Sequence, residues 1–219
     1  MRVGILGGTF DPIHFGHLRL AEEVGEALEL ECVHLIPAAL PPHKDRKPVS
    51  SFQHRMAMTR IAVEGAPRLK ALDLEGRRQG RSYSIETLRE FRKLFQDNFE
   101  LFFIIGMDAF LEIGTWKEYK KLFQYAHFLV INRPGFQAGD LEPFLSSLDV
   151  GFEREESSNT FVVPSGNRLI FKEATLMDIS STDIRNRVSE GKTIRFMLPE
   201  RVREYITENR LYRIHGNAR

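Results

Sequence analysis

The hydrophobic and polar positions of this 219-residue chain alternate between short apolar runs and longer amphipathic stretches. The apolar runs lie at 3–6, 33–36, 101–105 and 128–131, and each has the length of a buried strand. Apolar residues at helical spacing follow at about 14–30, 52–63, 85–95 and 118–125. Strands that alternate with helices predict βαβ units. We therefore expect a Rossmann-like, doubly wound α/β fold: a parallel sheet with helices on both faces.

The remaining segments show weaker patterns. Residues 134–164 are rich in Gly, Pro and Ser, so we expect a loop-dominated surface excursion with a short helix near 141–148. Residues 198–212 predict a helix whose packing stripe consists of Val202, Tyr205, Ile206 and Leu211. The chain shows no internal repeat and no composition break. We expect one domain over 1–219, in which the helical part at about 180–212 contributes to a phosphate-binding site.

Composition narrows the class of protein. A hydrophobic content of 42%, with 28% charged residues, is that of an ordinary globular protein. The net charge of +1 gives no indication of a nucleic-acid or membrane partner. The single cysteine, Cys32, lies in an apolar run and predicts a buried, inert thiol. The chain starts directly with a strand and has no apolar run long enough to span a bilayer, so we expect a cytoplasmic protein. The sequence leaves open whether the protein forms a homo-oligomer.

The first predicted strand is followed directly by residues that suit a phosphate site. Glycines let an anion approach the backbone amides. Asp11 and Pro12 predict the cap and first residue of a helix, whose free N–H groups and dipole would face that anion. Two histidines three residues apart would share one helix face. The segment is Gly7-Gly8-Thr9-Phe10-Asp11-Pro12-Ile13-His14-Phe15-Gly16-His17. A plain turn and a zinc pair are the alternatives, but no third metal ligand lies nearby.

Polar residues also follow the other predicted strands, where a parallel sheet places its ligands. Pro41-Pro42-His43-Lys44 follows the second strand, and is either a stiff connector with a solvated lysine or a source of positive charge for phosphates. Gly106-Met107-Asp108 follows the strand at 101–105, and Arg133 follows the next.

Three further segments carry polar side chains. In Asp178-Ile179-Ser180-Ser181-Thr182-Asp183-Ile184-Arg185, either Ser180 or Ser181 predicts a helix cap, and Arg185 one turn later makes the helix start a phosphate clamp. Ser82-Tyr83-Ser84-Ile85-Glu86-Thr87-Leu88 predicts another helix start. Trp116 is the only tryptophan of the chain. From its residue type alone, we expect it to be a core residue.

Taken together, these strings resemble the nucleotidylyltransferase superfamily, whose marks are a (His/Thr)-x-Gly-His motif and an Ile-Ser-Ser-Thr-x-x-Arg motif. The Gly-Gly-Thr-Phe-Asp-Pro lead-in and the Pro-Pro-His-Lys element resemble one branch, the bacterial nicotinate-nucleotide adenylyltransferases. The resemblance runs from residue 3 to about 212, and is weakest over 135–167. One departure is Ser84, where threonine is common. The implied activity is adenylyl transfer from ATP to nicotinate mononucleotide, which gives nicotinate adenine dinucleotide and pyrophosphate in NAD biosynthesis.

The resemblance also implies roles for individual residues. It implies catalysis by His17, His14 and Lys44, with Mg²⁺ carried on the ATP phosphates and no metal ligands on the protein. It implies stacking of the pyridine ring on Trp116, while amides at adjacent helix starts, near Ser84 and Trp116, bind the ring carboxylate. The implied ATP-binding residues are Gly7, Gly8, Thr9, Phe10, His14, His17, Gly106, Asp108, Ser180, Ser181, Thr182 and Arg185. The implied mononucleotide-binding residues are Lys44, Tyr83, Ser84, Trp116 and Arg133.

Two alternatives stay open on the sequence alone. The first is an adenylyltransferase for another phosphorylated substrate, such as nicotinamide mononucleotide or phosphopantetheine. The second is a nucleotide-binding module without catalysis, which the presence of His14, His17, Lys44 and Arg185 disfavours.

Overall fold

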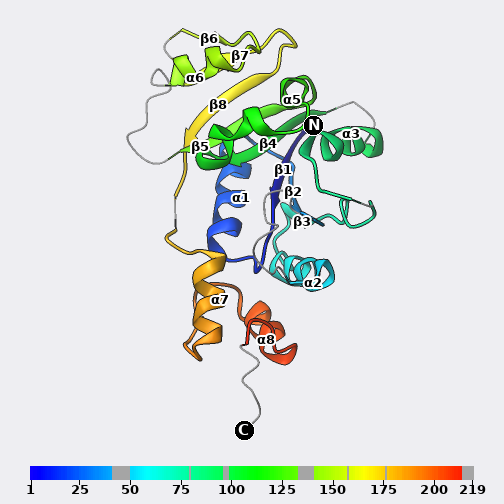
Figure 1. The fold of residues 1–219 in the computed structure, drawn as a ribbon, viewed down its shortest axis with the longest axis vertical. Helices are drawn as coiled ribbons and strands as arrows, with labels where there is room; N and C mark the ends of the chain where they lie inside the picture. Colours follow the sequence, from blue (N-terminus) through cyan, green and yellow to red (C-terminus); the bar gives the residue numbers. More distant parts are fainter. Residues whose placement is uncertain are drawn as a thin grey trace.

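In a computed structural model of the chain, one sheet with the strand order β3-β2-β1-β4-β5-β8-β7-β6 forms the centre of the fold (Figure 1). The structure describes residues 1–40, 50–78, 80–95, 99–132, 141–156, 158–175 and 177–213. Within these ranges the sheet has eight strands. They are β1 (Arg2–Gly8), β2 (Cys32–Pro37), β3 (Leu69–Ala71), β4 (Glu100–Gly106), β5 (His127–Asn132), β6 (Glu153–Arg154), β7 (Thr160–Val162) and β8 (Arg168–Glu173).

Helices connect and cover these strands. They are α1 (Phe15–Ala27), α2 (Phe52–Ala62), α3 (Ser84–Phe95), α4 (Met107–Leu111), the 3-10 turn η1 (Ile113–Thr115), α5 (Tyr119–Tyr125), α6 (Glu142–Ser147), α7 (Ser181–Ser189) and α8 (Glu200–Glu208). The four predicted strands are confirmed as β1, β2, β4 and β5. The predicted helices are confirmed as well, with one error at the start of α1 that concerns the site.

The sheet is parallel from β3 to β8 and antiparallel only at β7 and β6. The doubly wound prediction is therefore confirmed for the six parallel strands. The prediction of a loop-dominated excursion missed β6 and β7, although it included the short helix now seen as α6. Outside that segment, the hydrophobic pattern also missed β3 and β8, because β3 has three residues and the alternating pattern of β8 is too short to stand out.

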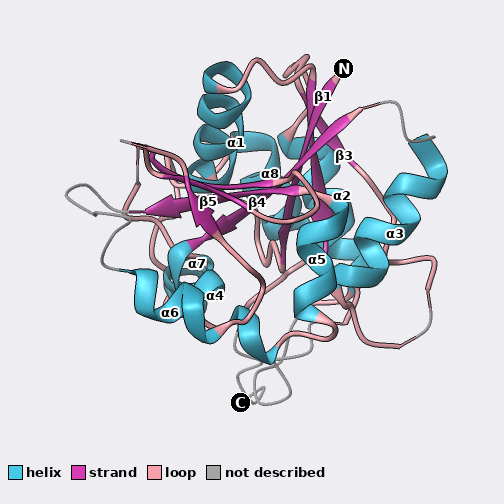
Figure 2. Ribbon diagram, turned by 90° about the horizontal axis from the view of Figure 1, so that it is seen from above, coloured by secondary structure: helices cyan, strands magenta, loops and turns pink. Residues whose placement is uncertain are grey.

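Helices cover both faces of the sheet (Figure 2), and the buried apolar side chains form one layer on each face. Alternate side chains of β4 enter different layers: Phe103 belongs to one and Ile104 to the other. The first layer packs under α3, α4, α5 and α6, and the second under α1, α2, α7 and α8. Cys32 is buried, as predicted, and Val202 and Ile206 of the predicted C-terminal stripe are buried as well.

The register brings the carboxyl ends of the central strands together. Gly8 of β1 lies beside Pro37 of β2, and Leu6 lies beside Ile104 of β4. Gly106, the last residue of β4, lies beside Ile131 of β5. The segments after these strands therefore leave the sheet at one edge, where a doubly wound fold places its ligands. No helix among the described residues is long and apolar enough to cross a membrane.

Candidate functional site

A cavity of about 610 Å³ opens at the carboxyl edge of the sheet. The ends of β1, β2 and β4 form its floor, and the segments before α3 and α5 form its walls. It is lined by seven of the residues that the sequence indicated: Gly7, Gly8, Thr9, Gly106, Tyr83, Ser84 and Trp116. It is also lined by Ser82 and Thr87 of the segment 82–88, and by residues that the sequence did not indicate, including Glu75, Arg81 and Lys117.

Glycine stands at positions 7 and 8 of the first segment for two different structural reasons. A Cβ on Gly7 would meet nothing within 4 Å, so the backbone there is open to the cavity. A Cβ on Gly8 would lie 2.7 Å from the Phe10 ring. Gly8 is therefore required by the packing of Phe10, which is 2% exposed. Because that side chain is buried, Phe10 can meet a ligand only through its backbone.

The start of α1 differs from the prediction. The helix begins at Phe15, and His14 is its N-cap, with extended backbone angles. Asp11 and Pro12 therefore do not cap it. The Asp11 carboxylate has other partners: one oxygen accepts from the Tyr212 hydroxyl at 2.7 Å, and the other accepts from the Ser50 amide at 3.2 Å. Asp11 thus holds three distant parts of the chain together at this loop.

His14 and His17 lie with their rings 3.7 Å apart at the N-terminus of α1. The His14 amide donates to Nδ1 of His17 at 3.3 Å, so the proton of a neutral His17 ring is on Nε2. Phe10 packs edge-on against the same ring, with centroids 5.0 Å apart. Burial lowers the pKa of His14 to about 4, so that this ring is neutral at pH 7. His14 therefore offers a neutral ring rather than a cation at this helix start.

One amide at the start of α1 is already used. The Phe15 N–H donates to the carbonyl of Met197 at 3.0 Å. This contact corrects the expectation that all the first N–H groups of the helix face an anion. The Gly16 amide still precedes the first hydrogen-bonded turn of the helix.

The start of α7 lies against this same loop. Ser180 is the N-cap, and its hydroxyl accepts from the Asp183 amide at 3.0 Å, as one of the two predicted caps. The Ser181 hydroxyl donates to the carbonyl of Pro12 at 2.9 Å. Arg185 donates to the carbonyl of Asp11 at 2.7 Å and to the Thr182 hydroxyl at 3.2 Å. The two strings, which lie far apart in the sequence, are therefore in direct contact.

The other end of the cavity contains the tryptophan. Trp116 is partly buried and packs edge-to-face on Phe103. Its own amide donates to the carbonyl of Ile113 at 2.9 Å and is therefore already used, while donors near Ser84 and Trp116 stay a prediction. The amides of Ser84 and Ile85 open α3 and precede its first hydrogen-bonded turn. Donors for a ring carboxylate are therefore expected at α3.

Charged groups surround this end. The Lys117 ammonium lies 4.5 Å from the centre of the Tyr83 ring and pairs with Glu86. Glu75 is 8% exposed, and one of its carboxylate oxygens accepts a 2.5 Å hydrogen bond from Thr87. No local sequence pattern indicates Glu75, because its partners come from another element.

Several predicted residues lie apart from the cavity lining. Asp108 is exposed in the first turn of α4, directly after Gly106, which is the N-cap of that helix. Lys44 and Arg133 lie outside the described residues, as do the other residues of the Pro-Pro-His-Lys element. Among the described ranges there is no group of three His, Cys, Asp or Glu side chains that could bind a metal ion.

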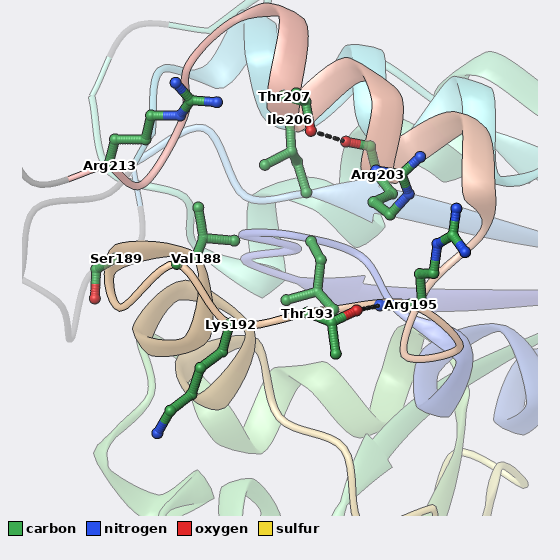
Figure 3. Close-up of a pocket in the computed structure, with 11 residues that line it drawn as sticks. Val188, Ser189, Lys192, Thr193, Arg195, Arg203, Ile206, Thr207 and Arg213 are labelled. Carbon is green, nitrogen blue, oxygen red and sulfur yellow. Dashed lines mark hydrogen bonds between the residues drawn. The ribbon is translucent and has the colours of Figure 1, made fainter.

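A second cavity, of about 440 Å³, lies between α7 and α8 (Figure 3). Four cationic side chains line it: Lys192, Arg195, Arg203 and Arg213. Arg203 pairs with Glu200, and Lys192 pairs with Glu190. The hydroxyls of Thr193 and Thr207 are bonded to the backbone of Arg195 and Arg203. The first cavity is therefore the better centre for chemistry, because it combines open backbone with aromatic and charged groups.

Comparisons with known proteins show which family the chain belongs to. The cytidylyltransferase-like family profile matches residues 5–187. A protein of Geotalea daltonii, named as a probable nicotinate-nucleotide adenylyltransferase, is 44% identical over 97% of this chain and 98% of its own length. A protein of the same name from Desulfatibacillum aliphaticivorans is 45% identical, over 97% of this chain and 100% of its own.

Solved structures with low sequence identity share the fold. The nicotinic acid mononucleotide adenylyltransferase of Plasmodium falciparum, in complex with NaAD, superimposes with a TM-score of 0.70 at 19% identity. The match covers 96% of this chain and 97% of that one. The same enzyme in complex with APC gives a TM-score of 0.69. From its sequence relatives, the chain belongs to the cytidylyltransferase-like family and, within it, to the nicotinate-nucleotide adenylyltransferases.

Proposed function

We propose that the protein transfers the adenylyl group of ATP to nicotinate mononucleotide and releases pyrophosphate. The observation that carries this proposal is the contact of Arg185 with the Asp11 carbonyl, 2.7 Å long. It joins the start of α7 to the loop of the two histidines, at the edge of the sheet where the cavity opens. This contact supports the proposal because it brings the proposed phosphate-binding groups of two distant segments together, close to Thr9, which lines the cavity.

The reaction needs little covalent chemistry from the protein. A phosphate oxygen of the mononucleotide attacks the α-phosphorus of ATP in line, and the bond from that phosphorus to the bridging oxygen breaks. The electron pair leaves with pyrophosphate. Catalysis is then mainly positioning and charge stabilisation. His17 donates from Nε2 to the phosphates, because its Nδ1 is occupied by the His14 amide. His14 and Lys44 also act on the phosphates in this reaction.

The start of α7 holds the part of ATP that leaves. Ser180, Ser181, Thr182 and Arg185 bind the β- and γ-phosphates, where a helix N-terminus and a guanidinium both favour anions. Residues 180–212 thereby form part of one catalytic domain with the sheet. Gly7, Gly8, Thr9, Phe10, Gly106 and Asp108 complete the ATP site.

The pyridine end determines which mononucleotide is used. The ring stacks on Trp116, and its carboxylate accepts from the first amides of α3, at Ser84 and Ile85. Lys117, which pairs with Glu86 beside Tyr83, places an ammonium group on this wall of the cavity. Arg133 is proposed to face the same substrate. A carboxamide would present an NH₂ group to these donors, so the nicotinate form is favoured.

Mg²⁺ enters as part of the ATP substrate in this proposal. Its preferred ligands are phosphate oxygens and water. The described residues provide no acidic cage that would hold it without ATP.

The proposal is tested with the purified chain, ATP and Mg²⁺, together with either nicotinate or nicotinamide mononucleotide, by measuring pyrophosphate release. We expect kcat/KM to be at least roughly tenfold higher for the nicotinate form, since unpaired donors in a fixed site discriminate strongly. Equal values would overturn the substrate assignment and leave adenylyl transfer intact. A lack of turnover with both mononucleotides would overturn the activity itself.

A further inference from the structure

Arg55 is a buried arginine for which the proposed reaction has no role. It belongs to α2, and its side chain is 1% exposed. The guanidinium donates to four backbone carbonyls, one of which belongs to the loop after β1. The four acceptors are Thr9 at 2.8 Å, Ala38 at 2.6 Å, Ala39 at 3.0 Å and Ser50 at 3.0 Å.

These carbonyls belong to the segments that leave β1 and β2 and to Ser50, which precedes the N-cap of α2. Thr9 and Ala38 also line the cavity. Arg55 therefore fixes, with one rigid group, the distance between the two strand ends on the floor of the site. Its position in the chain gives no hint of this, because its partners are backbone atoms of other elements.

A bonded carbonyl also determines the direction of the next amide. In a trans peptide the C=O and N–H groups point in opposite directions. Two of the peptides held by Arg55 show the effect: the Ala39 amide points to Glu75, with a distance of 3.4 Å, and the Leu40 amide points to Ser82, with a distance of 3.1 Å. In both, the carbonyl faces Arg55 and the amide faces the opposite side.

The third such peptide joins Thr9 to Phe10. Its carbonyl faces Arg55, so the Phe10 amide points away from that side chain. Unlike the amides of Ala39 and Leu40, the Phe10 amide has no hydrogen-bond acceptor among the described residues. Phe10 has a φ of +48°, which a side-chain residue seldom adopts unless its surroundings hold it there. Phe10 directly follows Thr9, which lines the cavity, and an amide held in a fixed direction there is a donor for an anion.

We propose that Arg55 is a positioning residue for adenylyl transfer, which turns the Phe10 amide toward the reacting phosphates and holds the strand ends that carry the site. This inference rests on the proposed function. Lysine cannot replace arginine here, because a single ammonium has three donors and no planar fork that could reach four carbonyls.

The first experiment compares Arg55→Lys with a matched variant, Arg92→Lys. Arg92 also bridges backbone carbonyls, those of Phe99 and Tyr125, but it lies in the last turn of α3 and does not line the cavity. We expect R55K to lower kcat at least tenfold, with the KM of each substrate changed less than threefold. R92K should lose thermal stability and keep its kcat. Both are assayed well below their own Tm.

Three outcomes of this comparison would contradict either the role of Arg55 or the proposed function. A folded R55K with kcat within threefold of the wild type would overturn the proposal. An equal loss of kcat in both variants, at matched loss of stability, would also overturn it, because that result indicates general loosening. An inactive wild type would instead overturn the proposed function.

A second measurement uses the wild-type chain and keeps the inference testable if R55K does not fold. The ¹⁵N-labelled protein is titrated with inorganic pyrophosphate, and the Phe10 amide resonance is followed. We expect the chemical shift of the Phe10 amide to change until pyrophosphate saturates the site, because this amide donates to a phosphate oxygen. The amide resonances of Ala39 and Leu40 should shift far less. A Phe10 amide that is insensitive to saturating pyrophosphate would overturn the proposal.

Discussion

Arg185 donates a 2.7 Å hydrogen bond from Nη1 to the carbonyl oxygen of Asp11, across 174 positions of sequence. The contact fixes the N-terminus of α7 against the loop that leads to His14 and His17. Ser181 reinforces it by donating to the next carbonyl, that of Pro12. Nη1 donates to Asp11 and Nη2 donates to Thr182, and the guanidinium has further N–H groups that can bind a phosphate.

Arg185→Ala should therefore raise the KM for ATP more than the KM for the mononucleotide. A charge-assisted hydrogen bond is worth about 1.5–3 kcal/mol, so we expect a rise of roughly ten- to a hundredfold. The variant should also lose about 1 kcal/mol of stability, because the Asp11 carbonyl loses its donor. Steady-state kinetics with each substrate varied in turn, together with thermal melts, measure both effects.

The matched control is Arg187→Ala. Arg187 lies further along α7, and it pairs with Asp183 at 2.9 Å on an exposed face. Its replacement should leave both Michaelis constants unchanged. If R185A raised the mononucleotide constant instead, the placement of the two substrates would be inverted.

His17→Ala should lower kcat by roughly 10² or more, with a smaller effect on substrate KM values, because a preorganised donor acts on charge that develops during the reaction. The fold should survive, since His17 is only partly buried. His127→Ala is the control: this histidine opens β5 at the amino edge of the sheet, away from the cavity. Near-normal turnover of folded H17A would remove His17 from its proposed role.

The central strands and the strings after them could be predicted because their signals are local. Strands buried on both faces read as continuous apolar runs, and parallel topology then places the loops after them at one edge of the sheet. The N-cap at Ser180 was likewise visible in its own segment. These features need no knowledge of distant contacts.

The features that the sequence analysis predicted wrongly or missed depend on contacts between distant segments. Asp11 followed by Pro12 looks like a helix start, but the Asp11 carboxylate is bonded to Ser50 and Tyr212, which no local pattern reveals. The burial of Arg55 is equally invisible, because its partners are backbone carbonyls of other elements. Side chains that tie distant segments together are therefore the part of a site that single-sequence reasoning misses.

The pH dependence of stability should depend in part on His34. This β2 residue is 7% exposed, packs against Phe91 and Phe95, and burial lowers its pKa from 6.5 to about 4. The unfolded chain then binds more protons between these two values, so stability is complete above about pH 6.5 and is lost as the pH falls toward 4. The group alone accounts for about 2 kcal/mol at pH 5.

His34→Leu should remove this contribution. Urea unfolding at pH 7 and pH 5 measures it: the wild type should lose more stability than the variant between these two values. His14 and His127 have pKa values lowered in the same direction, so part of the slope will remain in the variant. Identical slopes for wild type and H34L would show that His34 is not buried as a neutral group.

Trp116→Ala tests whether Trp116 recognises only the face of the pyridine ring, while α3 recognises its carboxylate. Stacking depends on the ring face, which both mononucleotides share, whereas the carboxylate is assigned to the first amides of α3. The variant should therefore weaken binding of both substrates by roughly two- to tenfold, in line with aromatic contacts of about 0.5–1.5 kcal/mol, and keep the preference for the nicotinate form. Trp116→Phe, which retains an aromatic face, should lie between the alanine variant and the wild type. The measurement is kcat/KM for each mononucleotide in all three proteins. A reversal of the preference in W116A would assign charge recognition to the tryptophan segment and not to α3, because only a group that senses the carboxylate can change the order.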